Sequence, residues 1–162
     1  MTTQAAFDLP FLGEQIDWRG GRAIWITCRP LRYTGPLLGG RTLVIPDEFL
    51  TDHASVPRLP ITYAIAGGRG IRSATIHDFA YQFGFWWLVD GTKLTVARSL
   101  VDGVFHESLV ADPISGVGRV IAWEMWLGVR AFGSGHWATE ERVTRLNPVW
   151  WAAHRSTPQQ LA

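Results

Sequence analysis

The spacing of apolar residues changes near residue 70, and this change constrains the fold more than any other feature of the chain. Before it, β-branched and aromatic residues gather in short runs at 23–28, 31–34 and 41–46, which is typical of strands. Between the last two runs stand Gly35-Pro36 and Gly39-Gly40, and such residues favour a turn between antiparallel strands. The N-terminal third therefore predicts a small antiparallel sheet.

After the cluster Gly67-Gly68-Arg69-Gly70, apolar residues recur every three or four positions. This spacing predicts helices over residues 73–85, 94–110 and 118–132, the last with core positions at Val120, Trp123, Trp126, Leu127 and Val129. The two halves together predict an α+β fold, in which a small N-terminal antiparallel sheet packs on about three α-helices.

Size and composition narrow the classes of protein that fit. The chain has 162 residues, of which 47% are hydrophobic, so we expect a single domain, 1–162, with its core in about residues 20–138. The formal charge of +1 provides no net field for nucleic acid, and a dedicated nucleic-acid binder is not expected. Cys28 is the only cysteine, which excludes an intramolecular disulfide and a multi-thiolate zinc site. No signal peptide and no transmembrane segment are expected from the hydropathy pattern.

The string Ala74-Thr75-Ile76-His77-Asp78-Phe79-Ala80-Tyr81 carries the strongest chemical signal. A helix places His77 and Tyr81 one turn apart on one face, with Asp78 about 100° away. An imidazole can accept a proton near neutral pH, a carboxylate can hold a hard cation, and a phenol can orient either group. The string predicts a hydrolytic site, and the alternative is a set of structural hydrogen bonds with Tyr81 in the packing.

Two further candidates lie outside this string. The loop Thr51-Asp52-His53-Ala54-Ser55-Val56-Pro57-Arg58 could present Asp52, Ser55 and Arg58 as binding residues, or could use its polar side chains to cap nearby backbone amides. Asp102, in the second predicted helix, could reach the His77 ring if the two helices pack antiparallel, and would then fix its tautomer. The alternative for Asp102 is a solvated charge on a helix face.

These strings occur in an order that resembles a known family. Thr51-Asp52 with 54–58, Ala74 with His77-Asp78 and Tyr81, Asp102 with Phe105, and 129–133 with Trp137 are together similar to an uncharacterised family of phage and prophage proteins, domain-of-unknown-function family 1353. The similarity spans about residues 42–137. It implies a gene of phage origin and supplies no activity.

A second, local resemblance concerns His77-Asp78 and Tyr81. This pattern looks like the active-site helix of phospholipase A2 enzymes, some of which occur in viral capsids. The resemblance implies that His77 activates water, that Asp78 binds calcium and that Asp102 orients His77. It also suggests backbone carbonyls of the glycine cluster, including Gly68 and Gly70, as further calcium ligands.

The nine tryptophans include two adjacent pairs, Trp86-Trp87 and Trp150-Trp151. Adjacent residues on a helix cannot both face one core, so we expect at least one member of each pair at a surface that contacts a partner or a membrane. For Trp123 and Trp126 we expect core positions.

Three classes of function fit these features. The first is a phage-encoded hydrolase that uses His77 and Asp78, with calcium as a possible cofactor, on a phospholipid ester or a cell-envelope bond during phage entry or exit. The second is a non-enzymatic virion protein of the tail or head, and the third is a host-modulating protein in the cytoplasm. The expected partners are phage structural proteins or the host envelope, and the expected location is the virion, or the host cytoplasm before assembly.

Overall fold

Two antiparallel sheets form the β part of the described residues. The computed structural model describes residues 4–8, 13–19, 22–53, 70–113 and 117–137. The larger sheet has five strands in the order β1-β4-β5-β7-β8, and the smaller sheet has three in the order β2-β3-β6. The strands are β1 (Ala6–Phe7), β2 (Gly13–Arg19), β3 (Arg22–Thr27), β4 (Leu31–Thr34), β5 (Thr42–Ile45), β6 (Leu50–Thr51), β7 (Phe85–Leu88) and β8 (Lys93–Thr95).

The three predicted strands are confirmed, as β3, β4 and β5. The turn between β4 and β5 is also confirmed, and it contains a short 3-10 helix, η1 (Pro36–Leu38). Strand pairing matches Leu31 with Ile45 and Thr34 with Thr42. The alternation of burial along β4 places Leu31 and Tyr33 in the core.

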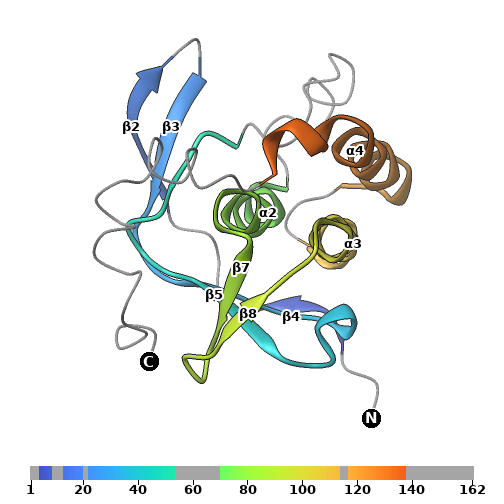
Figure 1. Cartoon of the computed structure of the whole chain (residues 1–162). Coiled ribbons are helices and arrows are strands. Elements are labelled where there is room, and N and C mark those ends of the chain that lie inside the picture. The colour runs from blue at the N-terminus through green and yellow to red at the C-terminus, as the bar shows by residue number, and fades with distance from the viewer. Residues whose placement is uncertain (1–3, 9–12, 20–21, 54–69, 114–116, 138–162) are drawn as a thin grey trace.

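Helix α2 (Ile71–Phe83) lies at the centre of the fold, in contact with β5 and β7 of the larger sheet and with α3 (Figure 1). Every residue from Arg72 to Phe83 is buried, the polar ones included. The helix is flanked by Gly70 and Gly84, and both glycines have a positive φ that other residues adopt only with strain. A Cβ on Gly70 would also lie 2.6 Å from Cδ2 of Leu109, so α2 and α3 approach closely there.

In the described part of the chain, α2 is followed by helices α3 (Arg98–Ala111) and α4 (Arg119–Phe132) and by the 3-10 helix η2 (Gly133–His136). The α+β class with three helices is confirmed among the described residues, and the predicted helix over 118–132 matches α4 closely. The prediction for 94–110 is wrong at its start. Residues 93–95 form β8, because they pair with β7 across the turn at Asp90-Gly91, and the helix begins at Arg98.

The expectation of a surface position for Trp86 or Trp87 is wrong. Both lie in β7, an interior strand of the larger sheet, with exposed fractions of 0% and 7%. The expectation assumed a helix, whereas both faces of this strand are covered. The indole Nε1 of Trp86 donates a hydrogen bond to the carbonyl oxygen of Ile76 at 2.8 Å.

The predicted core face of α4 is also largely wrong. Val129 is buried, but Trp123 is 52% exposed, and Val120 and Leu127 are exposed as well. The buried side of the helix is formed by Ala122, Met125, Gly128 and Val129. Apolar residues occupy both sides of α4, so apolar spacing alone could not identify the side that faces the core.

Candidate functional site

His77, Tyr81 and Asp102 form a compact cluster between α2 and α3. One carboxylate oxygen, Oδ1 of Asp102, lies 2.7 Å from the hydroxyl of Tyr81 and 3.2 Å from Nε2 of His77. The i, i+4 spacing on α2 stacks the His77 and Tyr81 rings, with centroids 4.1 Å apart. The structure therefore brings together the three residues that were predicted from the sequence as catalytic candidates.

Helix α4 completes the cluster from the side of Asp102. Nη1 of Arg130 donates a hydrogen bond to the second oxygen, Oδ2, at 3.1 Å. Arg98, at the first position of α3, donates through its own Nη1 to the carbonyl oxygens of Val129 and Arg130, at 3.5 and 3.2 Å. These bonds satisfy carbonyls at the end of α4 and tie it to the beginning of α3.

The electrostatics of the cluster define its protonation. Burial lowers the pKa of His77 more than the neighbouring Asp102 raises it, so the imidazole is neutral at pH 7. Burial acts to raise the pKa of Asp102, but hydrogen bonds from His77, Tyr81 and Arg130 outweigh it, and the pKa lies below its ordinary value. Burial, and then the bond to Asp102, raise the pKa of Tyr81. A neutral imidazole beside an ionised carboxylate carries its proton on Nε2 and its lone pair on Nδ1.

Nδ1 of His77 has no hydrogen-bond partner among the described residues. It lies 4.0 Å from Oδ1 of Asp78, a carboxylate whose other oxygen accepts a hydrogen bond from the hydroxyl of Thr51 at 2.6 Å. The arrangement resembles that of a histidine base, because one nitrogen is oriented by a carboxylate while the other keeps its lone pair.

The sequence hypothesis also required a His77 ring that faces solvent, and this expectation is wrong. The exposed fraction of His77 is 0%, as is that of Asp102. Tyr81 stacks on one side of the ring, and the ring of Phe105 lies 4.8 Å away, centroid to centroid. Catalysis at Nδ1 therefore requires some of the surrounding packing to open.

The described residues do not fit a calcium site at Asp78. Calcium binds roughly six to eight oxygen atoms, and here the structure places one carboxylate and the Thr51 hydroxyl. Gly70 does not lie beside Asp78, and its carbonyl accepts the hydrogen bond of Ala74 N at 2.9 Å. It also precedes Asp78 by two helical turns, or about 12 Å. The described part of the chain holds no group of three or more His, Cys, Asp or Glu side chains suited to a metal ion.

Several other candidates lie elsewhere in the chain. Ser55, Arg58, Gly68, Trp150 and Trp151 lie outside the described residues. Asp52 follows β6 beside His53, and its charge acts to raise the pKa of that histidine, although burial is the larger effect and lowers it to about 4.

Sequence reasoning gave no role in this cluster to four residues that the structure brings to it. Thr51 and Arg130 bond the two aspartates. Trp137 packs edge-on against Tyr81, with ring centroids 5.2 Å apart. A Cβ on Gly133 would lie 2.5 Å from the Tyr81 hydroxyl, so a glycine at this position leaves room for that hydroxyl. All four belong to the sequence strings on which the family resemblance rests. Their presence in those strings was the one sequence signal that could have identified them as site residues.

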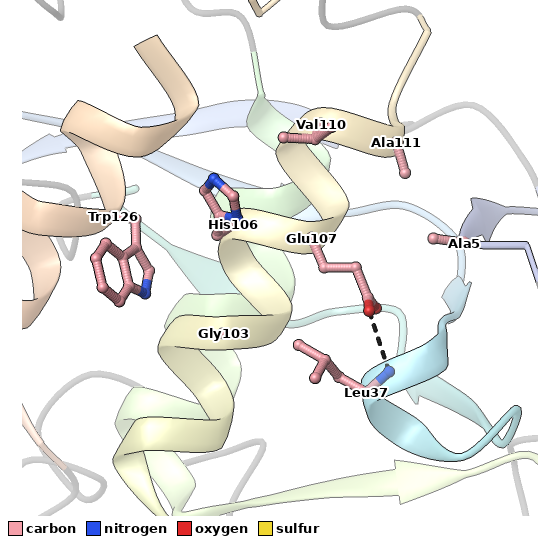
Figure 2. Close-up of a pocket in the computed structure, with 8 residues that line it drawn as sticks. All are labelled: Ala5, Leu37, Gly103, His106, Glu107, Val110, Ala111 and Trp126. Carbon is pink, nitrogen blue, oxygen red and sulfur yellow. Dashed lines mark hydrogen bonds between the residues drawn. The ribbon is translucent and has the colours of Figure 1, made fainter. Parts of the chain in front are cut away.

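A separate hollow lies on the other face of α3, away from Asp102 and Phe105. It is an open, mainly apolar groove of about 550 Å³, bounded by η1, α3 and α4 (Figure 2). Glu107 crosses one side of it and bonds Leu37 N at 3.0 Å and the Tyr33 hydroxyl at 2.7 Å. No residue of the His77 cluster lines this groove.

Comparisons with known proteins give one match. A family model described as "Protein of unknown function (DUF1353)" matches residues 25–129, which is more than half of the chain. No curated protein and no solved structure matches. The matched range contains His77, Asp78 and Asp102, and it ends one residue before Arg130. No described helix is long and apolar enough to cross a membrane.

Proposed function

Because the chain belongs to the DUF1353 family, whose description states no activity, we propose its function from the site itself: hydrolysis of an ester or cell-envelope bond with His77 as the general base. The observation that supports this proposal is the different environment of the two nitrogens of the His77 ring. Nε2 is held by Asp102, and Nδ1 keeps a lone pair that is bonded to none of the described residues.

The roles of the residues follow from this arrangement. Nδ1 of His77 removes a proton from water while the water oxygen bonds to the substrate carbonyl carbon. The imidazolium then returns that proton to the leaving oxygen as the ester bond breaks. Asp102 stabilises the imidazolium, and Tyr81 and Arg130 hold the carboxylate in place.

Access to the base is part of the proposed cycle. His77 is fully buried in the structure, so the proposed reaction requires an opening that exposes Nδ1. Substrate binding would shift packing around the ring, as lids and loops do in many hydrolases.

The biological setting of the proposal rests on the family resemblance. A phage-encoded hydrolase would act on a phospholipid or another envelope bond as the phage enters or leaves the host. The protein would then be located in the virion, or in the host cytoplasm before assembly, and its partners would be phage structural proteins or the host envelope.

A second function is favoured by one observation, the full burial of the cluster. His77 and Asp102 have no exposed surface, and their hydrogen bonds connect α2, α3 and α4. A buried polar network of this kind can fix the relative positions of helices without any catalysis. In that case the protein would be a non-enzymatic virion component of the tail or head.

Hydrolysis assays with a matched histidine control separate the two functions. Purified wild type, His77→Gln and His106→Gln are incubated with phospholipid vesicles and with peptidoglycan, each with calcium or with a chelator. His106 is the control because it lies on the groove side of α3, outside the cluster. The proposal expects a loss of about 100-fold or more for His77→Gln and wild-type rates for His106→Gln, with both variants folded by circular dichroism.

Equal rates for wild type and His77→Gln would refute the hydrolase, as would the absence of activity in the wild type under both metal conditions. The virion alternative is tested by mass spectrometry of purified phage particles. It requires this chain to be present in the particle.

A further inference from the structure

Two arginine side chains converge beside the His77 cluster, from the beginning of α3 and the end of α4. Arg98 and Arg130 are adjacent, because the guanidinium of Arg98 donates a hydrogen bond to the main-chain carbonyl of Arg130. Arg130 reaches inward to Asp102, and Arg98 lies close enough to the Tyr81 hydroxyl to affect its pKa. Both cations therefore lie on the Asp102 side of the proposed catalytic group.

Among the described residues, positive charge exceeds negative charge on this side of the cluster. Two guanidinium groups face one carboxylate, Asp102, and His77 is neutral. The other nearby carboxylate, Asp78, lies on the opposite side of the ring, next to Nδ1, and accepts a bond from Thr51. Helix α3 adds to the excess, because its positive end has no side-chain cap and no acidic residue in its first turn.

The arginines also have N–H groups that form no hydrogen bond to the described residues, and Arg130 is accessible to solvent. The side chain of Arg130 is 37% exposed, whereas that of Asp102 is fully buried. Only Nη1 of Arg130 bonds to a described residue, which leaves its Nη2 and Nε free of partners among them. Arg98 uses Nη1 on carbonyl oxygens, also interacts with the Tyr81 hydroxyl, and forms no ion pair with a described residue. Arginine forks with unused N–H groups are the usual donors to phosphate oxygens.

We propose that Arg98 and Arg130 form a binding site for a phosphate-type oxyanion on the Asp102 side of the cluster. This anion site goes beyond the proposed hydrolase and does not rest on it. A phosphodiester in a lipid headgroup and a soluble phosphate monoester share the required chemistry.

Phosphate binding is measured without any reference to catalysis. The melting temperature of the whole protein is followed against inorganic phosphate, with sodium chloride at matched ionic strength as the reference. Wild type is compared with Arg130→Gln, Arg130→Lys and Arg119→Gln. Arg119 is the matched control, since it lies exposed on the same helix. Phosphate is expected to raise the melting temperature of wild type and Arg119→Gln, and Arg130→Gln is expected to bind phosphate at least about tenfold more weakly. Arg130→Lys is expected to lie between them, because it keeps the charge and loses the fork.

Side-chain NMR makes the test independent of how well a variant folds. In the wild type, the Nε–H resonances of Arg98 and Arg130 are expected to shift on phosphate titration more than those of other arginines. The site is disproved if phosphate and chloride have equal effects on wild type, if Arg130→Gln binds phosphate as tightly as wild type, or if these two resonances stay unchanged.

Competition distinguishes the source of the phosphate group. Phosphatidylglycerol vesicles and glycerol 3-phosphate are each tested against inorganic phosphate. Competition by the vesicles supports a lipid headgroup at the site, and competition by glycerol 3-phosphate alone supports a soluble ester. Phosphate binding without any hydrolysis would retain the anion site and refute the proposed function, whereas hydrolysis without phosphate binding would do the reverse.

Discussion

Replacing Asp102 by asparagine tests whether one carboxylate holds the cluster together. The change preserves the shape of the side chain and removes its charge. In the wild type, Oδ1 accepts from Tyr81 and His77, and Oδ2 accepts from Arg130. The amide retains one oxygen, and its NH₂ group then faces a donor instead of an acceptor.

The expected loss of stability can be built up from these three bonds. A hydrogen bond to a charged group contributes about 1.5–3 kcal/mol, compared with about 0.5–1.5 kcal/mol for a neutral one. Tyr81 and His77 are buried and cannot turn to water, so weakening both bonds costs roughly 2 kcal/mol. Arg130 is more than a third exposed and can rehydrate, which limits its contribution to under about 1 kcal/mol. We expect Asp102→Asn to lower the free energy of unfolding by about 2–3 kcal/mol.

Urea unfolding at pH 7, followed by circular dichroism, measures this loss. Glu124→Gln on the exposed side of α4 is the control, expected within about 0.5 kcal/mol of wild type. Tyr81→Phe removes one donor alone, and its effect should couple to that of Asp102→Asn by at least about 0.5 kcal/mol in a double-mutant cycle. A loss below about 1 kcal/mol, or additive effects of the two substitutions, would refute the view that the carboxylate organises the cluster.

Three further predictions concern pH, packing and exposure. Burial lowers the folded-state pKa of His53 to about 4 and also lowers that of His77, so the unfolded chain binds more protons and stability falls as pH drops below about 6.5. His53 alone accounts for a loss of roughly 3 kcal/mol by pH 4. A urea midpoint that stays constant from pH 7 to 4.5 would contradict this prediction. Gly133→Ala places a methyl group against the Tyr81 hydroxyl and should cost about 1–3 kcal/mol, visible as a lower melting temperature. Trp123→Gln, at a 52% exposed position, should change the unfolding free energy by less than about 0.5 kcal/mol, and a larger loss would mean that this indole packs on the fold.

The parts of the fold that were predictable are those whose cause is local. Strands β3, β4 and β5 follow from runs of β-branched residues, and the turn between β4 and β5 follows from glycine and proline. Strand β7 could not be predicted in this way. Its sequence Phe-Trp-Trp-Leu continues the apolar run of α2, and the break depends on Gly84, which ends the helix with a positive φ.

The environment of helix α2 could not be predicted from its local sequence either. A helix on the surface reveals its buried face through its polar one, but α2 is buried on every side, and its polar residues are buried with the rest. Thr51 and Asp78 bond each other, and Arg72 forms an ion pair with Asp112. Such partners lie 27 and 40 positions apart, so nothing in the local pattern reveals them.

In the candidate site too, contacts within one helix were predictable and contacts that depend on helix packing were harder to predict. The stacking of His77 on Tyr81 is a property of one helix turn, and the sequence predicted it. The contact with Asp102 was predictable only on the condition that the two helices pack antiparallel, and the alternative was a solvated charge on a helix face. Arg130 was not predictable, because its role depends on how α4 is rotated, and apolar residues on both sides of α4 conceal that rotation.

Burial explains both the strength and the cost of the arrangement. Excluding water strengthens each bond to Asp102 and keeps the imidazole neutral, which are the conditions a base requires. The same exclusion keeps substrate from Nδ1, so any catalysis has to disturb the contacts that make the base effective. Arg130 is the member of the cluster with the largest contact with solvent, and it bonds the carboxylate oxygen that His77 does not use. An anion that binds this guanidinium could therefore loosen the outer side of the cluster while the bond between Asp102 and His77 is maintained.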